Sequence, residues 1–141
     1  MIQRIQTIYL TLAFFALAIF AAVGLAIDPS LVLLDDWHEW MTAAARLFAG
    51  LGGVAALIAI FRYADRKAQR DLIANAQWLV IVALVLEVVV IWLFPELVAF
   101  TERGLAAVSV LLPLFGYALL MLARKAIDRD IALVKSMDRL R

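Results

Sequence analysis

The chain has 141 residues, 67% of them hydrophobic, and its 13 basic and 12 acidic residues give a formal net charge of +1. Soluble domains contain roughly 45 to 50% apolar residues, so this composition indicates a single-domain membrane protein. The balanced charge gives no reason to expect nucleic acid as a partner. The absence of cysteine excludes disulfides, thiolate catalysis and Cys-ligated metal centres.

Four apolar segments approach the roughly 20 residues that a membrane-spanning helix needs. The first, 8–27, is followed by Asp28, Pro29 and Ser30, which favour a turn and predict that the helix ends there. Its apolar run is longer than the roughly 7 to 15 residues of a signal peptide. We therefore expect a retained span rather than a cleaved leader.

The second span, 42–61, should belong to a helix that begins near Trp37, because Asp36 can cap it and Glu39 can complete a capping box. Helices in lipid pack closely where small residues let their backbones approach. Two such faces are predicted as contacts, namely Ala18, Ala22 and Ala26 in the first span, and Ala45, Ala49, Gly52, Gly53 and Ala56 in the second.

The third span, 78–94, contains Glu87, and the fourth, 105–122, contains Pro113, where we expect a kink. In the tail, 123–141, apolar residues recur every three or four positions, which predicts an amphipathic cytoplasmic helix. Its apolar positions are Ile127, Ile131, Val134, Met137 and Leu140. This helix could lie on the inner membrane surface or bind a protein groove. The predicted fold is all-α, a four-transmembrane-helix bundle followed by this helix.

The basic residues predict the orientation of the bundle. Eleven of the thirteen lie at the N-terminus, between the second and third spans, or in the tail. The positive-inside rule therefore places the N and C termini in the cytoplasm. The aromatic residues predict the two interfaces, with Trp37, Trp40 and Trp92 at the outer one and Tyr9, Tyr63 and Trp78 at the inner one.

Glu87 and Arg46 are charged residues inside predicted spans. At 1.5 Å per residue, Glu87 lies roughly 8 Å beneath Trp92, and Arg46 roughly 9 Å beneath Trp40. An unpaired charge at this depth costs several kcal/mol, so we predict an intramembrane ion pair between the two side chains. The alternative is that Glu87 titrates and serves a small proton- or ion-coupled transporter.

Few residue types in the chain could support catalysis or metal binding. The one histidine, His38, lies at the predicted outer end, out of reach of Ser136 in the tail. One histidine cannot provide bis-histidine haem ligation, and no zinc-binding spacing is present. We therefore expect no enzyme activity, no cofactor and no metal site.

Three segments of the sequence carry a family resemblance. MIQRIQTIYL at the start, FRYADRKAQRDL in the centre and LVKSMDRLR at the end resemble an uncharacterised family of small four-span bacterial membrane proteins, a domain of unknown function found mainly in Bacteroidota. The resemblance implies a multi-pass protein of the bacterial cytoplasmic (inner) membrane. It transfers no catalytic residue.

These observations predict a structural, accessory or assembly factor that acts through its cytoplasmic basic face. The expected partners are membrane lipid and a protein at that face, and a homo-oligomer is left open. The candidate residues for contact with a partner or with lipid headgroups are Arg4, Arg66, Lys67, Arg70, Asp138, Arg139 and Arg141.

Overall fold

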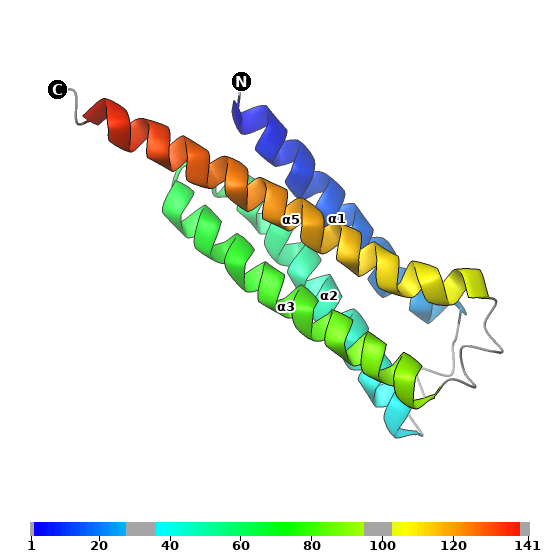
Figure 1. Cartoon of the computed structure of the whole chain (residues 1–141). Coiled ribbons are helices and arrows are strands. Elements are labelled where there is room, and N and C mark those ends of the chain that lie inside the picture. Colours follow the sequence, from blue (N-terminus) through cyan, green and yellow to red (C-terminus); the bar gives the residue numbers. More distant parts are fainter. Residues whose placement is uncertain (1, 28–35, 95–102, 139–141) are drawn as a thin grey trace.

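The computed structural model describes residues 2–27, 36–94 and 103–138, with side chains described for 5–22, 36–94 and 107–137. This part of the chain forms four helices, α1 (Ile2–Ile27), α2 (Trp37–Phe61), α3 (Arg66–Leu93) and α5 (Arg103–Asp138). Consecutive helices run in opposite directions, and α1 and α3 each pack against both α2 and α5 (Figure 1). All four are long and apolar enough to cross a membrane. The fold is thus an all-helical bundle compatible with a multi-pass membrane protein.

The described helix ends follow local sequence signals. α1 ends at Ile27, just before the predicted turn at 28–30, which lies outside the described residues. α2 begins at Trp37 with Asp36 as its N-cap, and the Asp36 N–H donates to Glu39 Oε2 at 3.4 Å, which is one half of the predicted capping box. At α3, the Ala68 N–H donates to Oδ1 of the N-cap residue Asp65 at 3.0 Å.

The fourth span and the tail form one helix rather than two. α5 continues through the buried Pro113 to Asp138, and no glycine or proline lies between Gly116 and that end. Ile127 is fully buried against the other helices, so the beginning of the tail belongs to the bundle core. α5 then extends past the ends of the other helices (Figure 1). The kink at Pro113 stays a prediction.

The predicted small-residue face of α2 is confirmed as buried, since Ala45, Ala49, Gly52, Gly53 and Ala56 all lie in the interior. The closest approach is at Gly52, where a Cβ atom would lie 2.9 Å from Val80 Cγ2 and 3.3 Å from the Ala76 carbonyl oxygen. The α2 and α3 backbones can approach this closely because position 52 has no side chain.

The predicted contact face of α1 is wrong. Ala18 is only half-buried, Ala22 is exposed, and the side chain of Ala26 lies outside the described residues. The buried face of α1 instead carries Leu10, Ala13, Leu17 and Phe20. Leu17 explains the difference, because it fits against Gly53 of α2 and Gly116 of α5. A large side chain of α1 thus fills the space beside small residues of its neighbours.

α3 enters the bundle earlier than its apolar run, 78–94, suggests. Ala76 and Val80 already contact Gly52, which lies well inside α2. Trp78 is 68% exposed, and its position at a membrane interface stays a prediction. The buried Gln69 of α3 donates from Nε2 to the Ala59 carbonyl at 2.9 Å, so a polar residue is accommodated there by a hydrogen bond.

Candidate functional site

Glu87 lies in the interior of the bundle. Its side chain is 6% exposed and shares the buried face of α3 with Ala76, Val80 and Ala83, as predicted. Glu87 forms a side-chain hydrogen bond with Ser109 of α5. Its other carboxylate oxygen, Oε2, has no hydrogen-bond partner among the described residues. The carboxyl group is therefore held between α3 and α5.

Arg46 connects this acid to the remaining two helices. Its Nη1 donates to the Phe20 carbonyl of α1 at 3.3 Å, and its guanidinium carbon lies 5.6 Å from the Phe20 ring centroid. Its positive charge also acts electrostatically on Glu87. Phe20, Arg46, Glu87 and Ser109, which we call the four-helix polar cluster, come from α1, α2, α3 and α5 respectively. A direct Arg46–Glu87 ion pair stays a prediction.

A groove of about 350 Å³ runs beside Arg46 between α1 and α2. Its lining residues are Ala21, Ala43, Arg46, Leu47, Gly50, Leu51 and Val54. Arg46 is the charged residue in this lining, and Glu87 is not part of it. The groove therefore reaches the cation of the polar cluster without reaching the acid.

A second group of charged side chains joins the start of α3 to the end of α5. Arg66 Nη1 lies 2.6 Å from Asp130 Oδ2, and Arg70 Nε lies 2.6 Å from Asp128 Oδ1. Opposite charges at this separation form ion pairs, and the two pairs join one turn of α3 to one short segment of α5. Two ion pairs and the buried side chain of Ile127 therefore hold this end of α5 against the bundle.

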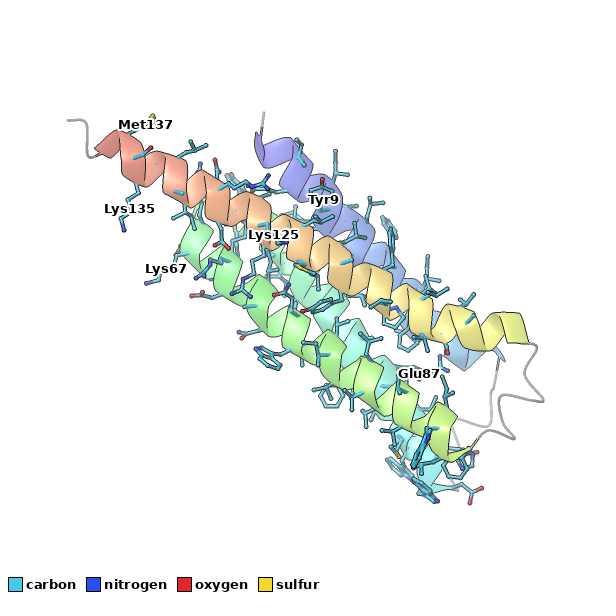
Figure 2. All side chains as sticks on the ribbon, in the orientation of Figure 1. Tyr9, Lys67, Glu87, Lys125, Lys135 and Met137 are labelled. Carbon is cyan, nitrogen blue, oxygen red and sulfur yellow. The ribbon has the colours of Figure 1, made fainter. Side chains whose placement is uncertain are left out.

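An open groove of about 800 Å³ lies beside these ion pairs. It is lined by Arg66, Lys67, Arg70, Asp128, Ile131, Val134 and Lys135. Lys67 and Lys135 are exposed and have no ion-pair partner among the residues whose side chains are described. Figure 2 shows them projecting from α3 and α5 on the same side of the molecule. We call this feature the α3–α5 groove.

The structure brings together three of the predicted contact residues, Arg66, Lys67 and Arg70, in the α3–α5 groove. The side chain of Arg4, near the start of α1, is not among the described ones, and neither is that of Asp138 at the end of α5. Arg139 and Arg141 lie outside the described residues altogether.

Sequence reasoning missed the partners that lie across helix interfaces. Arg124 Nη1 of α5 donates to Gln77 Oε1 of α3 at 3.0 Å, and the same pair of helices carries the Glu87–Ser109 hydrogen bond and both ion pairs. A signal was present, because Ser109 is a small polar residue in an apolar span. Pairing the third and fourth spans as antiparallel neighbours places it opposite Glu87.

Aromatic packing joins the start of α2 to the end of α3 at the other end of the bundle. The ring centroids of Trp37 and Phe94 are 4.7 Å apart, and those of His38 and Phe94 are 5.0 Å apart. His38 thus takes part in a ring contact. Across the described side chains, no group of three or more His, Cys, Asp or Glu residues is arranged to hold a metal ion.

Comparison with known proteins identifies the family of the chain. A family model described as a domain of unknown function (DUF4293) matches residues 2–140. Neither the curated proteins nor the solved structures contain a significant match. Because the family model covers nearly the whole chain, the chain belongs to the DUF4293 family.

Proposed function

We propose that this protein is a multi-pass protein of the bacterial cytoplasmic membrane that acts as a structural, accessory or assembly factor without catalysis. Both termini lie in the cytoplasm, as the distribution of basic residues predicts. α5 then crosses the membrane and presents its amphipathic end, residues 123–138, to the cytoplasm.

The end of α5 is the observation that carries this proposal. It extends beyond the other helices and exposes Leu133, Val134 and Met137, which are 52%, 43% and 63% exposed (Figures 1 and 2). Apolar residues at three- and four-residue spacing on one helix suit a protein groove. Burial of these exposed apolar side chains by a partner would contribute most of the favourable binding free energy.

The predicted contact residues take different roles in this proposal. Arg66 and Arg70 hold α5 in place through their ion pairs with Asp130 and Asp128. Lys67 and the charged terminal residues Arg4, Asp138, Arg139 and Arg141 remain the candidates for contact with the partner or with lipid headgroups. The charged groups would set the orientation of the partner, and the apolar groups would supply most of the affinity.

Photocrosslinking in native membranes tests this function. A photoreactive residue at Met137 should give one stoichiometric protein adduct. The same residue at Val85, an exposed position within the apolar span of α3, is the matched control and should give none. Leu133→Ser should weaken the adduct at position 137. Recovery of no stoichiometric partner at Met137 would contradict the accessory function.

Transport through Glu87 is the second candidate, favoured by the buried Oε2 without a hydrogen-bond partner among the described residues. An acid in the interior of a membrane bundle is a natural proton carrier. If this candidate is correct, Glu87→Gln should abolish proton movement in proteoliposomes while leaving folding unchanged. Equal proton movement by the wild type and by Glu87→Gln would exclude it.

A further inference from the structure

The α3–α5 groove lies at the level where the hydrocarbon of a membrane would end. On α2, the exposed aromatic residues Trp40 and Phe61 are 21 residue steps apart, or about 31 Å, close to the thickness of the hydrocarbon core. Gln69 donates to the Ala59 carbonyl, which places this part of α3 level with Phe61. The residues of α3 that line the groove, from Arg66 to Arg70, are therefore within one turn of the membrane edge.

The ion pairs place the α5 wall of the groove at the same level and continue it outward. Asp128 and Asp130 lie opposite Arg70 and Arg66, and Lys135 is five residue steps beyond Asp130, or about 8 Å. The headgroup layer adds roughly 5 to 8 Å to each side of the hydrocarbon core. The groove therefore extends through the whole headgroup layer.

The charges of the groove favour an anion. The aspartates neutralise Arg66 and Arg70 in the two ion pairs. Lys67 and Lys135 add two ammonium groups, one from each helix, with no ion-pair partner among the described side chains. Basic pockets between membrane helices on the cytoplasmic side bind anionic lipid headgroups.

The apolar residues of the groove decide between a lipid and a free anion. Ile131 and Val134 lie beside the lysines in the same lining. Contact with apolar side chains adds no binding energy for inorganic phosphate. The same contact favours binding of the glycerol and the first acyl carbons of a phospholipid. Because the groove lies in the headgroup layer, phospholipid headgroups are present beside it at high concentration.

We propose that the α3–α5 groove binds the headgroup of an anionic phospholipid, with Lys67 and Lys135 contacting the phosphate and Ile131, which is next to Asp130, contacting the glycerol region. This inference rests on the membrane insertion proposed above and is independent of the protein partner at Met137. The site holds the lipid between two helices, and one lysine from each helix contributes to its affinity.

Lipid retention by the full chain tests the site. The purified protein in neutral detergent is titrated with phosphatidylglycerol or with zwitterionic phosphatidylcholine, and bound lipid is counted by native mass spectrometry. Phosphatidylglycerol should be retained in preference. Lys67→Gln and Lys135→Gln should each weaken it about fivefold, and the double variant roughly 25-fold. Lys125→Gln, which removes an exposed lysine of α5 outside the groove, should leave retention unchanged.

Several results would overturn the site. Equal retention of the two lipids would do so, as would an equal loss with Lys125→Gln, which would indicate unspecific attraction. Inorganic phosphate that competes as well as the lipid would overturn the assignment to a phospholipid. If the photoreactive residue at Met137 gives no protein adduct while phosphatidylglycerol is still retained in preference, the proposed protein partner is contradicted and the lipid site is not. Each of these variants replaces only exposed lysines. Circular dichroism verifies that the variants are folded, because their helix content should equal that of the wild type.

Discussion

At the residue scale, the acidic Glu87 and the basic Arg46 lie within the bundle, and each contacts a residue of another helix. Arg46 is anchored to the Phe20 carbonyl and ring, and Glu87 to Ser109. Breaking a buried pair by removing one member leaves the other charge uncompensated, which is costlier than removing both. The stability of the bundle should therefore depend on the two residues jointly.

A double-mutant cycle measures this dependence. We expect Glu87→Gln and Arg46→Gln each to lower the free energy of unfolding by about 3 to 5 kcal/mol, and the double variant to lose clearly less than their sum. Reversible unfolding in mixed micelles provides the measurement. Asp71→Asn, at a mostly exposed carboxylate of α3, is the control and should change little. Strict additivity would show that the side chains act independently.

Two glycines of α2 provide a matched pair for close packing. A Cβ atom at Gly52 would lie 2.9 Å from Val80 Cγ2, whereas at Gly50 its nearest neighbour, Ala21 Cβ, would be 3.6 Å away. We expect Gly52→Ala to destabilise the bundle by about 1 to 3 kcal/mol through overpacking. Gly50→Ala should be neutral or stabilising, since alanine favours the helix. The same unfolding assay compares them, and equal losses would contradict the packing of α2 on α3.

At the element scale, the two ion pairs between α3 and α5 lie where α5 reaches the end of the bundle. Arg66, Arg70 and Asp128 are partly exposed, so each ion pair should contribute only about 0 to 1 kcal/mol. Ile127 is fully buried nearby and Leu120 lies one to two turns deeper. Packing therefore holds the inner part of α5, and the ion pairs set the position of its end.

Hydrogen exchange can separate these two contributions. We expect Asp128→Asn combined with Asp130→Asn to speed amide exchange in residues 128–137, with little change in residues 112–123. High salt should have the same effect on the wild type, because it screens exposed charges. Arg129→Gln, an exposed charge on the same turns, is the control. Unchanged exchange at the end of α5 in the double variant would show that the ion pairs do not position it.

At the scale of the whole molecule, the absence of cysteine allows a direct test of orientation. Figure 1 places both termini at one end of the bundle. Single cysteines at Ser136 and Asp65 should react with a membrane-impermeant maleimide only in inverted vesicles, and a cysteine at Trp37 only in intact cells or right-side-out vesicles. Labelling of Ser136→Cys from outside would reverse the proposed orientation.

The sequence predicted the four membrane-length helices well, because long apolar runs and a capping box such as Asp36 with Glu39 are local signals, but it divided α5 into a span and a separate tail helix. It failed where one helix meets another. The Ala18, Ala22 and Ala26 face was wrong because Leu17 fits the glycines of two neighbours. The point where α3 joins the bundle was also missed, because a hydrogen bond accommodates the buried Gln69 before the apolar run begins. The partners Ser109, Asp128 and Asp130 belong to the antiparallel register of α3 and α5, which no single segment encodes.

The continuity of α5 has a mechanical consequence. Ser109, beside Glu87, and Asp130, beside Arg66, are 21 residue steps apart on one helix, or about 31 Å. Pro113 lies between them and leaves the Ser109 carbonyl without its usual backbone donor, so we expect α5 to bend most easily there. Bending of α5 at Pro113 should therefore shift Ser109 relative to Glu87 and disturb the hydrogen bond that joins these two side chains.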